Sequence, residues 1–191
     1  PLNDNAVVKK ATANVKIDRD YVDYYVSPDG DDVNNDGSKD KPFKTINKAI
    51  TEAFAKNIYV NIYLLEGTYS GTENVNLELT KLLGYLNIIG VDGKTIIDGN
   101  GKDYAFNFGI KNIIFTNLYN KKYAGLIEGG SGDFTVNIDN CTFEKCNAKY
   151  LIETNGEINN VIMRDNNIAS SFISGAVSID NLLFENNSGN G

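Results

Sequence analysis

The chain contains no histidine and no tryptophan, and cysteine and proline are scarce, with two and three copies. The missing histidine removes the commonest general base and the commonest transition-metal ligand of proteins. Basic residues are also few, because 18 Lys and Arg stand against 25 Asp and Glu, a formal net charge of -7. Since nucleic acids are bound by clustered Lys and Arg, this balance argues against a nucleic-acid partner and suits cations or neutral glycans.

The sequence also lacks a long hydrophobic run and a signal peptide. No segment approaches the roughly 18 apolar residues that a membrane-spanning helix needs, so no membrane span is predicted. The chain starts at Pro1, which leads us to expect a processed product or an excised piece of a longer protein. Its 191 residues predict one domain with a sizeable core.

What the sequence does contain is an internal repeat, Ile-x-Asn-Φ-x-[Phe/Met], where Φ is apolar. Its four clear copies are Ile110–Phe115, Ile138–Phe143, Ile158–Met163 and Ile179–Phe184, and a weaker fifth copy, Tyr85–Gly90, precedes them. Counted from the end of the weak copy, the last residues of the copies are 25, 28, 20 and 21 residues apart. This spacing is typical of solenoids.

Each repeat predicts one coil of stacked backbone. The Asn at its third position tolerates a left-handed conformation and predicts a bend, which is followed by a short strand. We expect these residues to stack and to hydrogen-bond along the axis as an Asn ladder: Asn112, Asn140, Asn160 and Asn181. A second apolar pair accompanies each coil: Ile96-Ile97, Leu126-Ile127, Leu151-Ile152 and Phe172-Ile173.

Hairpins of a β-sandwich do not repeat one motif at one register, whereas stacked coils must. The sequence therefore predicts an all-β fold, a right-handed parallel β-helix or solenoid. The repeat also points Cys141 into the core, and Cys146 follows close by. This favours two buried thiols that act as small hydrophobic side chains over a disulfide, which stays the alternative.

The N-terminal end of a solenoid needs a cover. Phe43, Ile46, Ile50 and Phe54 lie at helical spacing after a proline, which predicts an N-terminal capping α-helix over about 42–56. A solenoid end without such a cover exposes apolar surface and strand edges.

The helix and the repeats set the expected domain limits. We expect residues 1–20 to form a linker or a flanking strand and residues 21–191 to form the β-helix domain. No helix is predicted after the last repeat, so we expect that further coils followed in the parent protein. An uncapped C-terminal coil also predicts end-to-end self-association.

Two segments resemble the pectate-lyase-like superfamily of parallel β-helix proteins. YVSPDGDDVNNDGSKDKPFKTINKAI, Tyr25–Ile50, is similar to its N-terminal signature, and GVDGKTIIDG, Gly90–Gly99, is similar to its second-coil phrase. Together with the Asn- and Tyr-rich coils, the chain most resembles adhesin-like cell-surface proteins of methanogenic archaea, over roughly residues 24–191. Because the superfamily includes lyases, hydrolases and non-catalytic adhesins, the resemblance alone selects no activity.

The segment before the predicted helix matches the start of a calcium loop. Asp32, Asn34 and Asp36 alternate before a glycine that permits a sharp turn, and Asp40 supplies a later ligand. The motif departs at its twelfth position, where Phe43 replaces the bidentate Glu. The alternative is a polar turn that leads into the helix, with Asp40 near the helix's positive end.

Two sets of charged residues are candidates for catalysis. Glu144, Arg164 and Glu185 follow the last residue of successive repeats, and lyases of the superfamily pair a basic residue with calcium-binding carboxylates. The alternative is a ladder of salt bridges worth about 0.2–1 kcal/mol per pair. Hydrolases of this fold use clustered Asp, for which the candidates are Asp133, Asp139 and Asp180. The last two recur at one repeat position, which indicates a turn role instead.

The sequence thus predicts an extracellular, cell-surface protein that is not an enzyme. We expect a non-catalytic, adhesin-like β-helix that binds a glycan or a surface protein through its loops and tyrosines. The alternative is a calcium-dependent polysaccharide lyase acting on uronate-rich glycans. A third interpretation is a stalk that only spaces a distal domain. The expected cofactor set is empty apart from a structural calcium in the loop.

Overall fold

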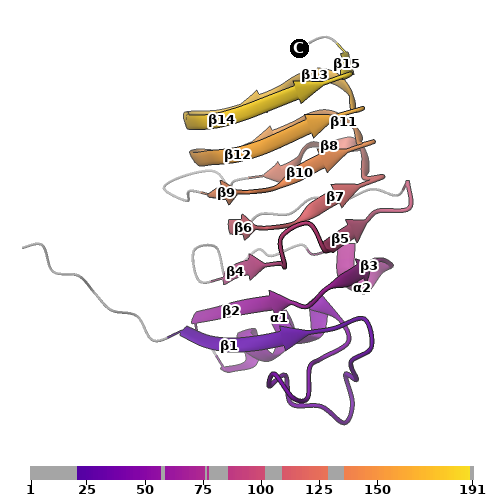
Figure 1. Cartoon of the computed structure of the whole chain (residues 1–191), viewed down its shortest axis with the longest axis vertical. Coiled ribbons are helices and arrows are strands. Elements are labelled where there is room, and N and C mark those ends of the chain that lie inside the picture. Colours follow the sequence, from indigo (N-terminus) through magenta and orange to yellow (C-terminus); the bar gives the residue numbers. More distant parts are fainter. Residues whose placement is uncertain are drawn as a thin grey trace, which may run out of the picture.

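The computed structural model describes residues 21–56, 59–75, 77, 86–101, 109–128 and 136–189. These residues form a stack of coils that rises from β1 (Tyr21–Val26) to β14 (Val177–Glu185), as Figure 1 shows. Within this part of the chain, every pairing between strands is parallel. The fold is therefore the predicted all-β parallel β-helix.

The strands form three faces. The first consists of β1, β2 (Tyr59–Leu64), β4 (Leu86–Ile89), β6 (Gly109–Lys111) and β9 (Ile138–Asp139). The second consists of β3 (Gly67–Tyr69), β5 (Thr95–Asp98), β7 (Ile114–Thr116) and β10 (Thr142–Glu144). Strands β12 (Gly156–Arg164) and β14 continue from the first face into the second. The third consists of β8 (Tyr119–Glu128), β11 (Asn147–Glu153), β13 (Asn167–Ser174) and β15 (Ser188–Gly189).

The four clear copies of the repeat occupy equivalent positions. Phe143 pairs with Phe115 on the coil before it and with Met163 on the coil after it, and Met163 pairs with Phe184. The rings of Phe115 and Phe143 stack with their centroids 5.1 Å apart and their planes 7° from parallel. The predicted register of these coils is thus confirmed.

The register predicted for the weaker copy, Tyr85–Gly90, is wrong. Ile88 pairs with Ile110, so this coil begins its repeat later than the pattern predicts. In the same register, Phe115 pairs with Ile97. The apolar pair Ile96-Ile97 therefore lies on the second face, whereas the other three predicted apolar pairs lie on the third face. The Asn of this copy lies within β4 instead of at a bend, which explains the misplacement.

Left-handed residues turn the chain at two corners of each upper coil. The first corner is the predicted Asn bend, and its four φ angles lie between 51° and 57°, at Asn112, Asn140, Asn160 and Asn181. The second corner lies between the second and third faces and was not predicted. Its φ angles lie between 50° and 55°, at Asn117, Lys145, Asp165 and Asn186. Asn and Asp are the residues that adopt this conformation most readily after Gly.

The predicted Asn ladder is formed in part. Asn140 donates its amide to Asn112 at 3.0 Å, and Asn181 donates to Asn160 at 3.0 Å. Between these two pairs the ladder is interrupted, because Asn160 donates to the carboxylate of Asp139 at 3.4 Å. Neighbouring coils are therefore joined at this corner by side-chain hydrogen bonds, but not by one continuous row of amides.

A second ladder lies inside the coil at the other corner. Asn166 is 1% exposed and donates to the carbonyl oxygen of Phe143 and to Asn187, each at 3.0 Å, while its own oxygen accepts from the backbone N–H of Cys146 at 2.9 Å. Because a buried amide without partners is costly, these bonds make Asn166 compatible with the core.

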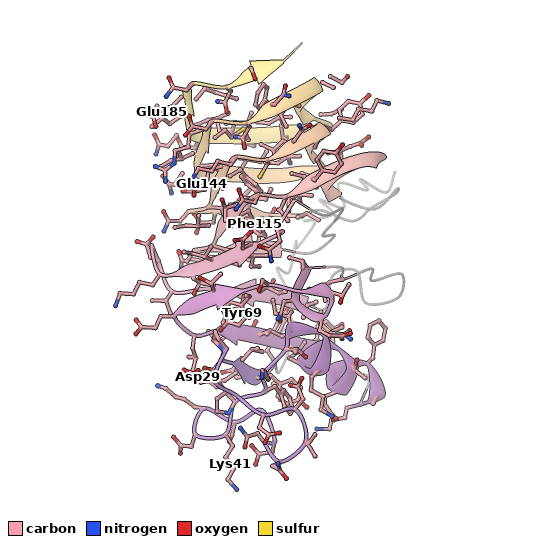
Figure 2. All side chains as sticks on the ribbon, turned by 90° about the vertical axis from the view of Figure 1, so that its right-hand side faces the viewer. Asp29, Lys41, Tyr69, Phe115, Glu144 and Glu185 are labelled. Carbon is pink, nitrogen blue, oxygen red and sulfur yellow. The ribbon has the colours of Figure 1, made fainter. Side chains whose placement is uncertain are left out.

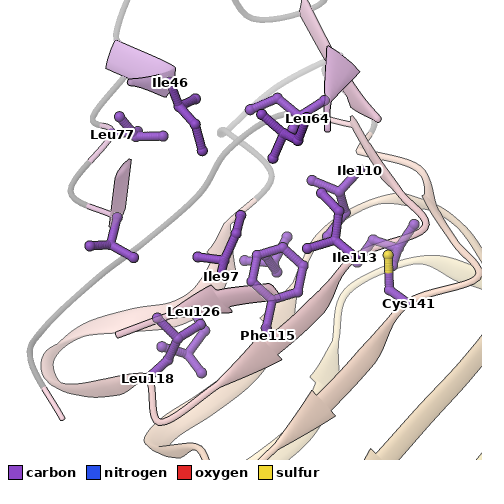
Figure 3. Close-up of a cluster of buried hydrophobic side chains, with 14 of the residues drawn as sticks. Ile46, Leu64, Leu77, Ile97, Ile110, Ile113, Phe115, Leu118, Leu126 and Cys141 are labelled. Atoms are coloured by element: carbon purple, nitrogen blue, oxygen red, sulfur yellow. The ribbon is translucent and has the colours of Figure 1, made fainter. Parts of the chain in front are cut away.

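The core is one continuous column of apolar side chains (Figure 3). Cys141 lies in it beside the repeat's isoleucines, and both Cys141 and Cys146 are buried and free, as the preferred interpretation predicts. Burial raises the pKa of each thiol to about 12. The thiols therefore stay protonated and serve as packing groups.

The capping helix is present but shorter than predicted. α1 (Ile46–Lys56) packs against β1, β2 and the short α2 (Thr72–Val75) at the N-terminal end of the stack. It begins at Ile46 and not near residue 42, because the backbone of Phe43 exchanges hydrogen bonds with Tyr25 and Ser27 beside β1. No helix in the described part of the chain is long and apolar enough to cross a membrane.

Inward side chains of the last described coil are exposed to solvent. Ile179 and Phe184 are 46% and 48% exposed, whereas their partners one coil earlier, Ile158 and Met163, are fully buried. Self-association at this end stays a prediction. Residues 1–20, assigned to a linker or flanking strand, lie outside the described residues.

The corner asparagines are expected to stabilise the fold by two separable effects. Asn140→Ala removes both the tolerance for positive φ and the bond to Asn112, so we expect the free energy of unfolding to fall by about 2–3 kcal/mol. Asn140→Gly removes only the side-chain bond and is expected to cost about 1 kcal/mol. Urea denaturation measures both, and Asn159→Ala, in an extended segment of β12, serves as the control. Equal losses for Ala and Gly would contradict the conformational part of the argument.

Candidate functional site

The outward side of the first face carries aromatic and amide side chains near the N-terminal end. Successive residues of a strand face opposite sides, and five of the six inward residues of β1 and β2 are buried: Tyr24, Val26, Val60, Ile62 and Leu64. The alternate residues therefore face outward. Together with one residue of β4 they form what we call the Tyr–Asn surface: Tyr21, Asp23, Tyr25, Tyr59, Asn61, Tyr63 and Asn87.

Two pairs of tyrosines flank this surface. Tyr25 and Tyr63 are in register on adjacent coils, and their rings stack with centroids 5.2 Å apart and planes 19° from parallel. Tyr21 and Tyr59 form an edge-on pair with centroids 5.6 Å apart and planes 67° apart. Because each ring is packed against its partner, the phenol groups lose little conformational freedom when they contact a ligand.

A row of polar side chains lies between the tyrosine pairs. Asn87 donates to the side-chain oxygen of Asn61 at 3.0 Å, and Asn61 donates to the carboxylate of Asp23 at 3.1 Å. These bonds fix the orientation of both amides and leave the carboxylate at the end of the row. The row therefore offers oriented donors and acceptors at the spacing of successive coils.

The hydroxyl group of Tyr63 stays protonated. Partial burial, followed by electrostatic interactions with Asp23 and Tyr25, raises the pKa of Tyr63 above its ordinary value of 10.0. A protonated phenol both donates and accepts a hydrogen bond. The Tyr–Asn surface thus combines flat apolar rings with amide, hydroxyl and carboxylate groups, a composition suited to binding polyhydroxylated molecules.

The sequence contains a signal for this surface. Tyr21-x-Asp23-x-Tyr25 and Tyr59-x-Asn61-x-Tyr63 repeat one alternating pattern in two segments that become adjacent coils. The abundance of tyrosine was noted from composition, but the repeated spacing was not used. An outward row at period two, repeated from coil to coil, is what identifies such a surface.

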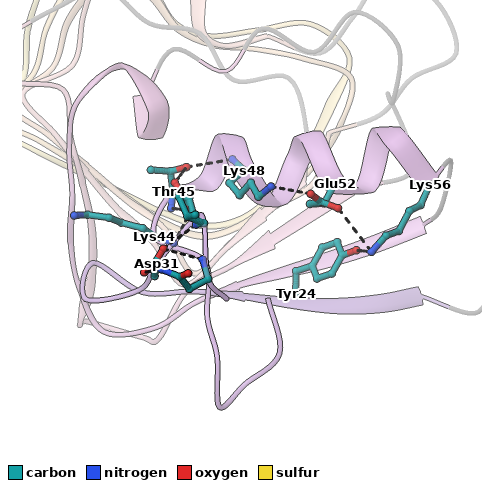
Figure 4. A network of polar contacts seen from close by, with 10 residues as sticks. Tyr24, Asp31, Lys44, Thr45, Lys48, Glu52 and Lys56 are labelled. Atoms are coloured by element: carbon teal, nitrogen blue, oxygen red, sulfur yellow. Dashed lines mark hydrogen bonds and ion pairs between the residues drawn. The ribbon is translucent and has the colours of Figure 1, made fainter. Parts of the chain in front are cut away.

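The predicted calcium loop leads into α1, and its first carboxylate holds the two residues that precede that helix. Asp32 accepts hydrogen bonds from the backbone N–H groups of Lys44 and Thr45 at 2.7 and 3.0 Å and from the Thr45 hydroxyl at 2.8 Å. Figure 4 shows this region, from Asp31 and Thr45 along the helix to Lys56. Asp32 therefore positions Thr45, whose hydroxyl oxygen caps the helix by accepting from the backbone N–H of Lys48 at 3.2 Å.

The other predicted ligands are also engaged locally or exposed. Asn34 donates to Asp31 at 2.8 Å, and Asp36 accepts from the N–H of Ser38 at 3.0 Å, while Asp40 is exposed. The hydrogen bonds from Ser38 lower the pKa of Asp36 below its usual value. No group of three or more Asp, Glu or Cys side chains able to hold a metal occurs among the described residues. Calcium binding stays a prediction.

Two of the three residues considered for a lyase site, Glu144 and Arg164, form a salt bridge. Arg164 donates to one carboxylate oxygen of Glu144 from Nε at 2.8 Å and from Nη2 at 2.6 Å. The hydrogen bonds to Glu144, together with its charge, raise the pKa of the guanidinium further above its usual value. Glu144 and Glu185 lie on the same side of the stack (Figure 2). This geometry matches the salt-bridge interpretation and holds Arg164 protonated.

The hydrolase candidates do not form a pair of neighbouring carboxylates. Asp139 binds the ammonium group of Lys111, and Asn159 lies between Asp139 and Asp180 in the register of the first face. Asp133 lies outside the described residues. The two described candidates are therefore separated by a coil.

These features define a parallel β-helix protein with an aromatic and amide-rich outer surface. The chain belongs to the family described as protein of unknown function (DUF1565), whose family model matches residues 28–189. This family commonly adopts a parallel β-helix, in agreement with the structure. No curated protein and no solved structure matched the chain.

The role of Asp32 in positioning the capping residue Thr45 gives a testable expectation. Asp32→Ala removes three hydrogen bonds to Lys44 and Thr45, just before α1, and we expect it to lower the free energy of unfolding by about 1–2 kcal/mol in EDTA as well as in calcium. Asp40→Ala, which removes an exposed carboxylate of the same loop, is the control. Thermal unfolding of both variants measures the difference, and equal stabilities would refute the positioning role of Asp32.

The same experiment tests the calcium prediction. A ligand that binds only the native state raises the melting temperature by mass action. A rise with added calcium that EDTA reverses and that Asp36→Ala abolishes would establish the site. An unchanged melting temperature up to millimolar calcium would rule out the calcium site.

Proposed function

We propose that the chain is a non-catalytic, adhesin-like module of an extracellular cell-surface protein, and that its Tyr–Asn surface binds a glycan. The observation that carries the proposal is the ordered row of Asp23, Asn61 and Asn87 between two pairs of packed tyrosines. Sugars offer hydroxyl groups in every direction and apolar C–H faces. Oriented amides beside aromatic rings complement both.

The charge of the surface indicates a neutral glycan. Asp23 ends the polar row, and the chain as a whole carries a formal charge of -7. An acidic surface repels polyanions and does not repel uncharged sugars. The repeated coil also holds the side chains at one spacing, so a linear glycan meets a regular series of contacts along the stack.

The cell-surface part of the proposal rests on resemblance. Residues 24–191 resemble adhesin-like proteins of methanogenic archaea within the pectate-lyase-like superfamily, and the match to a family of unknown function is compatible with this assignment. The non-catalytic part is supported by the state of the lyase candidate, because Arg164 is bonded to Glu144. A general base must accept a proton, and a guanidinium held protonated by a carboxylate is poorly suited to that role.

A glycan array with the wild-type chain and two variants tests the binding site. We expect binding to neutral glycans and a loss of roughly 30-fold for Tyr25→Ala with Tyr63→Ala, since a packed aromatic contact contributes about 2 kcal/mol. Tyr150→Ala, which removes a half-buried tyrosine of the third face, is the matched control. Silence across a broad array would favour a stalk, and binding only to proteins would favour the other partner class.

An assay for unsaturated uronate products at ultraviolet wavelengths tests the non-catalytic assignment. The chain is incubated with uronate-rich polysaccharides with and without calcium. We expect no product in either condition. Calcium-dependent product that Arg164→Gln abolishes would replace the proposal with the lyase.

A further inference from the structure

A groove of about 430 Å³ runs along the second corner, away from the first face. Its lining consists of Asn100, Gly101, Asn117, Leu118, Tyr119, Lys145 and Asn147, and it shares no residue with the Tyr–Asn surface. The lining combines three amide side chains, one aromatic ring and one cation. The volume falls within the range of small-molecule sites, and the mostly polar lining suits a hydroxylated ligand.

Lys145 is unusual in its backbone. Its φ is 55°, in the left-handed region that Asn and Asp adopt far more readily than other residues with side chains. The equivalent positions of the neighbouring coils follow that preference with Asn117, Asp165 and Asn186. A lysine does not stabilise this turn as Asn or Asp does. The side chain of Lys145 is therefore the feature that distinguishes this coil.

The ammonium group of Lys145 is available to a ligand. Asp165 lies beside it on the next coil, as the backbone bonds at this corner show, yet no ion pair or side-chain hydrogen bond involves Lys145 within the described residues. These two oppositely charged side chains therefore form no ion pair with each other. An unpaired cation in a polar groove favours a negatively charged group.

The amides of the groove have unused hydrogen-bonding capacity. Asn117 donates to Asp98 at 3.2 Å. Among the described residues, its side-chain oxygen accepts no hydrogen bond, and the side chains of Asn100 and Asn147 form none. Tyr119, in register with Asn147 on the adjacent coil, supplies a half-buried ring. These groups extend beyond the reach of one small ion and suit the hydroxyls and the apolar face of a sugar.

We propose that the second-corner groove is a second binding site, specific for a sugar that carries one anionic group, and that Lys145 binds that group. The acidic chain disfavours polyanions, whereas a single charge beside Lys145 is compensated locally. The site stands independently of the Tyr–Asn surface. Loss of either site leaves the other intact.

Titration of the full chain with glucose 6-sulfate, glucose and inorganic sulfate, followed by amide chemical shifts, tests the site. We expect glucose 6-sulfate to bind at least 10-fold more tightly than the other two and to shift resonances of Asn117, Lys145 and Asn147. Lys145→Asn is expected to weaken this binding at least 10-fold. Its melting temperature should not fall, because Asn is the residue that neighbouring coils use at this corner.

Lys39→Asn is the matched control, since it removes the same charge from an exposed position in the loop before α1. We expect it to bind glucose 6-sulfate as the wild type does. Equal affinity for inorganic sulfate or for glucose, unchanged binding by Lys145→Asn, or the absence of binding would each overturn the proposal. Weaker binding by both lysine variants would show a general charge effect and would also overturn it.

Discussion

The whole structure depends on successive coils lying over one another in register, about 4.8 Å apart. That register is kept by corners at which the backbone turns through a left-handed residue, as at Asn140 and Asn160. Asn serves both needs, because it tolerates the conformation and its amide reaches a neighbouring coil. A coil that lost its corner would displace the inward rows of apolar residues and expose them.

The stacking divides the residues of each coil into two groups with different constraints. Inward positions such as Phe143 and Met163 must fill one shared column, so packing restricts them to apolar side chains. Outward positions are repeated at the same spacing but are free to vary. The tyrosine pair of Tyr25 and Tyr63 and the exceptional Lys145 both arise at such positions. A rigid scaffold with variable outer rows is well suited to binding.

Much of the chemistry that suggests catalysis is used to hold the coils together. Asp32 holds the residues that precede α1, Arg164 is bonded to Glu144, and Asp139 binds Lys111. Each of these contacts joins residues that lie at least 12 positions apart in the sequence, and each lowers the free energy of the folded chain modestly. The Tyr–Asn surface is left with amides and phenols, which can donate and accept hydrogen bonds to a ligand.

The sequence alone determined the solenoid, because an identical motif at the same register satisfies its polar corners and apolar interior only when coils stack. It also determined the four Asn bends and the capping helix. Only the tertiary structure decided the register of the coil at Ile88 and the second corner at Lys145. It also decided the partners of the charged residues that were candidates for catalysis. The physical reason is that bends and periodicity are local properties, whereas the partner of a carboxylate such as Glu144 lies on another coil, at a distance that coil length sets and no local pattern records.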